Sequence, residues 1–298
     1  MIPYHVRATG TVVEVWSGYR IQFGGMERHS WQKELKSELK QSLSCLSIPA
    51  GTALSGYYNT SDPRSSDTEN SLFTNVLESM PLGVSMLRFE RGNCEPPATP
   101  VPVDLSGGHL HYYRYEAGGQ WTTWQPDQTI ARWNRVPRRL PDDGSARPVW
   151  FALRDANAAG HVTAIEHRRA DDATFGLRLT VHATNRGPRD AIRYSEKLVD
   201  GVIAAFHNDR RSDALVATLT PKLRGVTAGA LGQVLEQPAG PLFSLPAIRT
   251  KGGYVQISPD DERCIVGEVT ITRDSLGPWP ELSGELFTVR PFDPPAPR

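Results

Sequence analysis

The sequence of 298 residues has little cysteine and no excess of either charge. Its three cysteines, Cys45, Cys94 and Cys264, are odd in number and far apart, which excludes both a disulfide framework and a clustered zinc site. Lys plus Arg and Asp plus Glu each total 33, so the formal net charge is zero and no overall field attracts a polyanion. Any site for nucleic acid must therefore be local.

Long hydrophobic runs are also absent from the sequence. No stretch approaches the roughly 18–20 apolar residues of a membrane span, and residues 1–7 lack the basic and apolar pattern of a secretory signal. We therefore expect no membrane contact and a cytoplasmic location.

Glycine and proline, with 26 and 24 residues, are more abundant than usual, which favours many turns over a helical bundle. The apolar periodicity predicts an α+β fold of two similar-sized domains, each a mixed or antiparallel sheet with helices packed on one face. A polar break at 137–148 predicts domains at 1–140 and 148–298. The expected strands are 11–16, 19–23, 52–58, 84–89, 109–115, 120–124, 149–153, 162–167, 175–183, 254–257, 264–272 and 286–289, and the expected helices are 31–46, 68–80, 192–206 and 227–236.

The two halves contain a similar series of elements. Strand 52–60, the turn at Pro63-Arg64 and helix 72–80 correspond to strand 177–184, the turn at Pro188-Arg189 and helix 198–206. The offset of about 125 residues is the length of an ordinary domain. The second domain could thus be a divergent repeat of the first, or the two could be unrelated α+β units.

The densest group of polar side chains lies at 62–70, between an expected strand and an expected helix. Asp62, Asp67 and Glu69 could hold Mg²⁺, which prefers oxygen ligands and needs few protein carboxylates when a substrate supplies phosphates. Alternatively, Asp67 and Glu69 simply cap the helix, because carboxylates stabilise the free N–H groups of a first turn.

Asp67-Thr68-Glu69-Asn70, after a strand and before an apolar helix, resembles the Asp-x-Asp-Asn signature of the RusA-type crossover-junction endonucleases. The resemblance implies an α+β, Mg²⁺-dependent nuclease in which Asp62, Asp67 and Glu69 are the catalytic and metal-binding residues. Family members act as dimers on branched DNA, so a tandem duplication would resemble a dimer fused in one chain. Glu69 stands where the family has its second Asp, which puts complete catalysis in doubt.

A second acidic set lies in the other half of the chain. Asp190, Asp200 on the helix at 192–206, and Asp209 after it resemble the helix and acidic turn of the same family. This half lacks the Asp-x-Asp-Asn run, so one or both sites could be degenerate.

Arginines and aromatic side chains gather between 109 and 139, partly in an expected hairpin at 109–124. Guanidinium groups beside aromatic faces suit phosphates and unstacked bases, but such residues also form core packing, ion pairs or protein interfaces. The nucleic-acid-binding candidates are Arg132, Arg135, Arg138, Arg139, Trp121, Trp124 and Trp133.

The sequence therefore supports two hypotheses. The first is a Mg²⁺-dependent, nuclease-like protein that processes nucleic acid. The second is a non-enzymatic module that binds a protein partner through the aromatic and arginine hairpin. No Gly-x-Ser-x-Gly turn supports a serine hydrolase, and no glycine-rich fingerprint supports nucleotide-cofactor chemistry.

Overall fold

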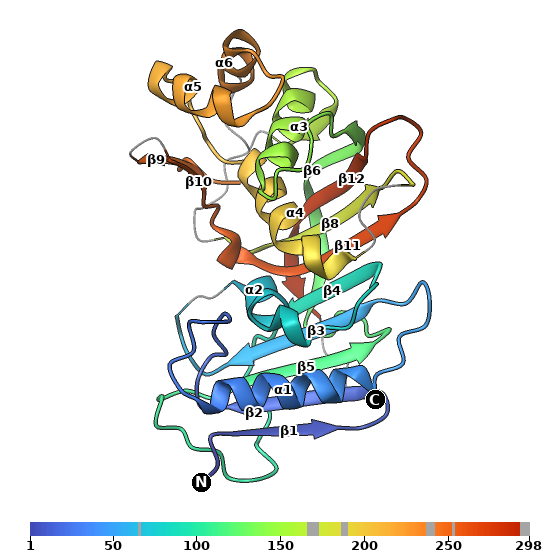
Figure 1. The fold of residues 1–298 in the computed structure, drawn as a ribbon, viewed down its shortest axis with the longest axis vertical. Helices are drawn as coiled ribbons and strands as arrows, with labels where there is room; N and C mark the ends of the chain where they lie inside the picture. Colours follow the sequence, from blue (N-terminus) through green and yellow to red (C-terminus); the bar gives the residue numbers. More distant parts are fainter. Residues whose placement is uncertain (65–66, 166–172, 186–189, 237–241, 252–253, 293–298) are drawn as a thin grey trace.

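A computed structural model describes residues 1–64, 67–165, 173–185, 190–236, 242–251 and 254–292. The chain has an α+β fold built on one ten-stranded sheet with the strand order β1-β2-β5-β3-β4-β11-β8-β12-β6-β7 (Figure 1). Its strands are β1 Tyr4–Ala8, β2 Val12–Ser17, β3 Leu54–Thr60, β4 Met86–Arg91, β5 His111–Ala117, β6 Trp124–Pro137, β7 Val162–Ala164, β8 Phe175–His182, β11 Cys264–Thr272 and β12 Glu281–Pro291. A separate antiparallel pair consists of β9 Ile248–Lys251 and β10 Tyr254–Ile257.

Four helices lie over one face of the large sheet, as the sequence predicts for each half (Figure 1). These are α1 Trp31–Ser44, α2 Thr68–Leu72, α3 Arg147–Ala158 and α4 Ala191–Ala205. Two further helices, α5 Asp213–Leu219 and α6 Ala228–Glu236, lie beyond α3, and the 3₁₀ turns are η1 Thr74–Ser79, η2 Thr220–Lys222 and η3 Asp261–Arg263.

The two halves of the sheet repeat one local arrangement. β3 pairs in parallel with β4 and antiparallel with β5, and β8 pairs in parallel with β11 and antiparallel with β12. The connection of the first parallel pair contains α2 and η1, whereas that of the second begins with α4 and also contains α5, α6, β9 and β10. The halves join where β4 and β11 pair antiparallel, from Met86 opposite Thr270 to Glu90 opposite Val266. β6, which precedes the expected domain boundary, pairs with β12 and β7 of the second half.

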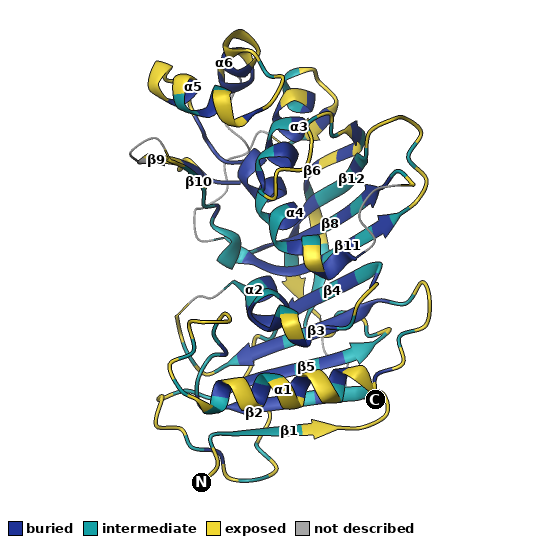
Figure 2. Ribbon diagram, viewed as in Figure 1, coloured by how far each residue is buried: buried dark blue, intermediate teal, exposed yellow. Residues whose placement is uncertain are grey.

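Helix α1 forms where the leucine spacing predicts it. Leu35, Leu39 and Leu43 recur every four residues, so they occupy one helical face, and all three are fully buried. This apolar stripe belongs to one hydrophobic core that extends through both halves, while the outer faces of α1 and α5 are exposed (Figure 2).

The strand expected at 149–153 is wrong, because this segment lies in α3. Pro148 occupies the first turn, where a missing N–H is tolerated, and Trp150 and Leu153 bury themselves three residues apart. A short apolar run fits a helix or a strand equally well, and here the helical spacing is the true one.

The strand expected at 19–23 and the hairpin expected at 109–124 are also wrong. Residues 19–23 form no strand, and strand β2 pairs with β1. Strand β5 pairs with β2 and β3, so the hairpin at 109–124 does not form. The helix expected at 68–80 is interrupted at Phe73, whose φ of −123° and ψ of −52° separate α2 from η1.

The sheet face opposite the helices carries a row of alternating charges. Arg88, Glu268, Arg178, Glu285 and Arg132 stand opposite one another on β4, β11, β8, β12 and β6. Ion pairs of 2.5 Å between Arg88 and Glu268, 2.9 Å between Arg178 and Glu285 and 2.8 Å between Arg132 and Glu285 connect the row. We call these five residues the charge ladder. Their alternation explains how this wide face can meet water.

Among the described residues, none of the helices combines the length and the apolar character that a membrane span requires.

Candidate functional site

Three aspartates from distant parts of the chain meet near the centre of the sheet, on its helical side. Asp67 caps α2, Asp200 lies on α4, and Asp261 begins η3 immediately before β11. α2, α4 and η3 pack together beside the joined strands β4 and β11 (Figure 1). We call Asp67, Asp200 and Asp261 the acidic cluster.

Within the acidic cluster, the carboxyl of Asp261 lies close enough to those of Asp67 and Asp200 for their side chains to interact. A hydrogen bond between two carboxyls needs a proton, because two adjacent carboxylates repel each other. Burial and the neighbouring negative charges raise the pKa of Asp261 and the pKa of Asp200 far above their usual range. The cluster therefore holds protons near neutral pH.

Two glutamates extend this acidic region. Glu69 is 2% exposed, and its carboxyl accepts hydrogen bonds from the hydroxyls of Ser195 and Thr74. Burial, together with the charge of Asp67, raises the pKa of Glu69 well above its usual range. Burial and Asp67 likewise raise the pKa of Glu196 on α4. Both halves of the chain therefore contribute acids to one place.

Asp67 has two roles at the head of α2. Its Oδ1 accepts the N–H of Asn70 at 3.1 Å, so the capping role predicted from the sequence is confirmed. Its other interactions reach Asp261 and, at longer range, the guanidinium of Arg20, which lowers the Asp67 pKa against the larger effect of burial. Asp67 therefore both caps α2 and belongs to the acidic cluster.

The chemistry of this donor set suits a hard cation, since carboxylate oxygens are the ligands that Mg²⁺ prefers. Within the described ranges, however, no three His, Cys, Asp or Glu side chains form a ready-made metal centre. In the present arrangement the pKa values of all three carboxyls are raised. A cation would compete with protons for them, so metal affinity and pH would be linked.

The remaining predicted acids lie outside the cluster. Asp62 pairs with Arg64 at 2.6 Å and faces His109 at 3.8 Å, and the hydrogen bond from Arg64 holds its pKa well below the usual range. Asp190 caps α4 by accepting the N–H groups of Ile192 and Arg193. Asp209 accepts the Ile248 N–H at 2.9 Å. The structure therefore joins Asp67 from one predicted set to Asp200 from the other. The turn at Pro188-Arg189 lies outside the described residues.

Sequence reasoning missed Asp261 and Glu196. The acidic run Asp260-Asp261-Glu262 directly before a predicted strand was the available signal for Asp261. Glu196 lies one helical turn before Asp200, so both face the same side of α4.

The predicted nucleic-acid-binding residues are distributed over different environments. Arg132 belongs to the charge ladder. Trp133 is 2% exposed and packs on Phe206. The Trp124 indole donates to the Arg91 carbonyl, and the half-buried Trp121 lies beneath the guanidinium of Arg178. Arg138 is half-buried, and burial lowers its pKa, whereas Arg139 is exposed.

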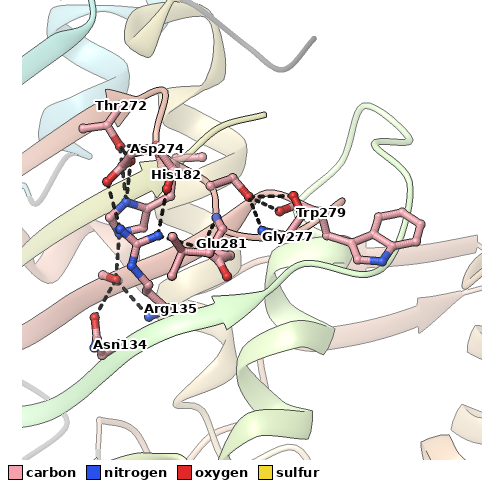
Figure 3. A network of polar contacts seen from close by, with 12 residues as sticks. Asn134, Arg135, His182, Thr272, Asp274, Gly277, Trp279 and Glu281 are labelled. Carbon is pink, nitrogen blue, oxygen red and sulfur yellow. Dashed lines mark hydrogen bonds and ion pairs between the residues drawn. The ribbon is translucent and has the colours of Figure 1, made fainter. Parts of the chain in front are cut away.

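Arg135 belongs to a polar network near the ends of β6 and β8 and the start of β12 (Figure 3). Its guanidinium binds Asp274 and Glu281, each at 2.8 Å. Its φ of +47° is unusual for a residue with a side chain, and the register between β6 and β12 shifts at this point. The network therefore holds a strained bulge in place.

Within this network, Ser283, His182 and Asp274 are connected in the order of a hydrolase triad. Ser283 Oγ lies 2.9 Å from His182 Nε2. His182 Nδ1 lies 2.8 Å from Asp274 Oδ1 (Figure 3). However, Ser283 Oγ also accepts the Arg135 backbone N–H at 2.9 Å, and the Asp274 side chain is 52% exposed rather than buried. These contacts assign the three residues to support of the bulge.

Comparisons of the chain with protein-family models, with curated proteins and with solved structures found no match.

Proposed function

We propose that the protein is a Mg²⁺-dependent, nuclease-like enzyme that processes nucleic acid, with its site at the acidic cluster. The observation that carries this proposal is the contact of Asp67, Asp200 and Asp261 across the two halves of the chain. The charges that act most strongly on Asp200 and Asp261 are those of other carboxylates. Such an arrangement is costly unless protons or a cation neutralise it.

In this proposal Asp67, Asp200 and Asp261 would hold the ion. Bound Mg²⁺ would supply an activated water molecule and stabilise charge on a phosphoryl group. The residues of the chain would fix the position of the ion: the Asn70 N–H orients Asp67, and the packing of α4 and η3 orients the other two carboxyls. Glu69, whose carboxyl accepts hydrogen bonds from the hydroxyls of Ser195 and Thr74, would support the packing around these three aspartates.

Two further sequence expectations accompany the proposal. The tandem-duplication hypothesis agrees with the repeated strand and helix order, and we retain it. We also retain a cytoplasmic location, since Cys45, Cys94 and Cys264 are all free thiols. The interaction-module hypothesis required an exposed hairpin at 109–124, which does not form.

Calorimetric titration with Mg²⁺ and Mn²⁺ tests the proposed site. The wild-type protein should bind at least one of the ions and release protons, which a comparison of buffers with different ionisation enthalpies would measure. Asp200→Asn and Asp261→Asn should weaken binding at least tenfold. Asp155→Asn, an exposed acid on α3, provides the matched control and should bind like the wild type.

Cleavage assays on single-stranded, duplex and four-way-junction DNA should then show activity that follows ion binding across the same variants. Absence of ion binding by the wild-type protein, or equal binding by both cluster variants, would overturn the proposal.

A further inference from the structure

A polar cavity of about 420 Å³ lies in the first half of the chain. It is bounded by the end of β3 at Tyr58, the start of β5 at His111 and the segment after β2 that contains Arg20. Arg20 connects the cavity with the acidic cluster, because it lines the cavity and its charge acts on Asp67.

The cavity lining is rich in cationic side chains. Arg20, Arg28 and Arg64 all line it, and of these Arg64 is neutralised by Asp62. Arg20 and Arg28 form no ion pair with any described residue, and Arg20 Nε is a buried donor without a hydrogen-bond partner in the described chain. Two guanidinium charges therefore remain for a ligand.

The buried histidine of the cavity, His111, has a different role from the arginines. His111 is 5% exposed, and its Nδ1 lies 2.9 Å from the Tyr58 hydroxyl. Burial lowers the pKa of His111 to about 4, so this ring is neutral at pH 7 and offers hydrogen bonds rather than charge. The positive character of the cavity at neutral pH thus comes from arginine, the side chain best suited to phosphate.

A row of aromatic rings leads away from the cavity. Tyr19 lines the cavity and lies 4.5 Å from the His29 ring; His29 stacks on Trp31 at 5.7 Å, and Trp31 stacks on Tyr4 at 5.7 Å. All four rings are half-buried rather than fully enclosed. Arginines beside partly exposed aromatic rings are what a single nucleic-acid strand requires, since it presents phosphates and unstacked bases together.

We propose that this cavity binds a phosphate of a single-stranded nucleic acid through Arg20 and Arg28, with neighbouring bases against the aromatic row. The inference rests on the proposed function, because it supplies the substrate-binding surface for the acidic cluster. It also moves the expected phosphate contacts from Arg132–Arg139 to a different part of the chain.

Fluorescence anisotropy with a labelled 12-nucleotide single strand, measured in EDTA, tests the inference. EDTA removes divalent cations, so failure of the metal site would leave this measurement unaffected. Arg20→Gln with Arg28→Gln should weaken binding at least tenfold. It should also reduce the slope of log affinity against log salt by about 0.7, the contribution of one phosphate contact on a single strand.

Arg132→Gln is the matched control, because this exposed arginine already pairs with Glu285. It should change neither the affinity nor the salt slope. The exposed Arg28→Gln alone should weaken binding in part, which keeps the test valid if the double variant is unstable.

The source of the phosphate is tested by competition. Pyrophosphate should compete weakly, and Trp31→Ala should reduce oligonucleotide binding without changing pyrophosphate binding. Equal competition by pyrophosphate, with no effect of Trp31→Ala, would assign the cavity to a free phosphate compound. It would overturn the proposal that the ligand is a single-stranded nucleic acid. Wild-type affinity in the Arg20 and Arg28 variants, or no oligonucleotide binding by the wild type, would overturn the cavity assignment.

Discussion

The acidic cluster and the charge ladder use the same kinds of side chain on opposite faces of one sheet. In the ladder, each charge stands beside an opposite charge, and the face remains in contact with water. In the cluster, carboxyls contact carboxyls in a partly buried position. Neutralised pairs such as those of the ladder add little to stability or function, whereas unneutralised acids indicate a place where a ligand or a proton acts.

The largest expected effect is on the pH dependence of stability. The pKa of Asp200 is raised to about 8 in the folded chain, against about 3.9 when unfolded, so the folded state binds more protons between these values. Stability should therefore fall as pH rises from about 4 to about 8. Asp200→Asn with Asp261→Asn should remove this loss, which we expect to be on the order of 2–3 kcal/mol.

Urea denaturation in EDTA at several pH values would measure this difference. The same experiment on Glu285→Gln of the ladder should show no such recovery at high pH. Parallel pH profiles for the wild type and the double cluster variant would contradict the proton-sharing arrangement.

A smaller effect is expected at Glu69. Its variants test whether this acid supports the fold, in contrast to the aspartates that we propose bind the ion. Glu69→Ala should destabilise the protein by about 1–2 kcal/mol, because it leaves a cavity and removes an acceptor of the Ser195 and Thr74 hydroxyls. Glu69→Gln keeps an acceptor of the same size and should stay within about 1 kcal/mol of the wild type near pH 6. Thermal unfolding of the two variants side by side checks the contrast, and equal losses would contradict a protonated Glu69.

Asp67 should show an effect of about 1 kcal/mol on stability, the usual cost of a lost helix cap. Asp67→Ala removes the acceptor for the Asn70 N–H, whereas Asp67→Asn retains one. Both variants should lose ion binding, since neither has a carboxylate at this position. Chemical denaturation and calorimetry together distinguish the roles, and ion binding by Asp67→Asn would limit Asp67 to capping.

The smallest effect should come from the ladder. A double-mutant cycle of Arg132→Gln and Glu285→Gln should give a coupling of about 0.2–1 kcal/mol, because the Arg132 side chain is 65% exposed. The coupling should largely vanish in 1 M salt, where the screening length is about 3 Å. A coupling of several kcal/mol would mean that the two faces differ less than we argue.

Much of the fold could be predicted from local patterns. The leucine stripe at Leu35, Leu39 and Leu43 locates α1, and apolar runs locate β3, β8 and β11. The segment around Trp150 was mistaken for a strand because five apolar or small residues cannot show which period applies. The β5 partner was mistaken because hairpin logic considers only the next segment, whereas β5 lies between β2 and β3.

The site was partly predictable for a related reason. Asp67 and Asp200 each stood out locally, as a helix cap and as an acid on an apolar helix. Their meeting with Asp261 depends on the antiparallel join of β4 and β11, which no local pattern encodes. Arg20 and Arg28 are isolated in sequence, so no local pattern marks them as a site. The run at 132–139 is rich in arginine, but Arg132 and Arg135 already have carboxylate partners.

The join between β4 and β11 also determines what would happen to a piece of the chain. A fragment that ends before β6 would leave β4 without its neighbour and expose a row of unpaired N–H and C=O groups along a strand whose Leu87 and Phe89 are buried. Such an edge recruits any available strand. Half of this protein expressed alone should therefore self-associate or aggregate, and co-expression of the missing half should rescue it as a reassembled heterodimer.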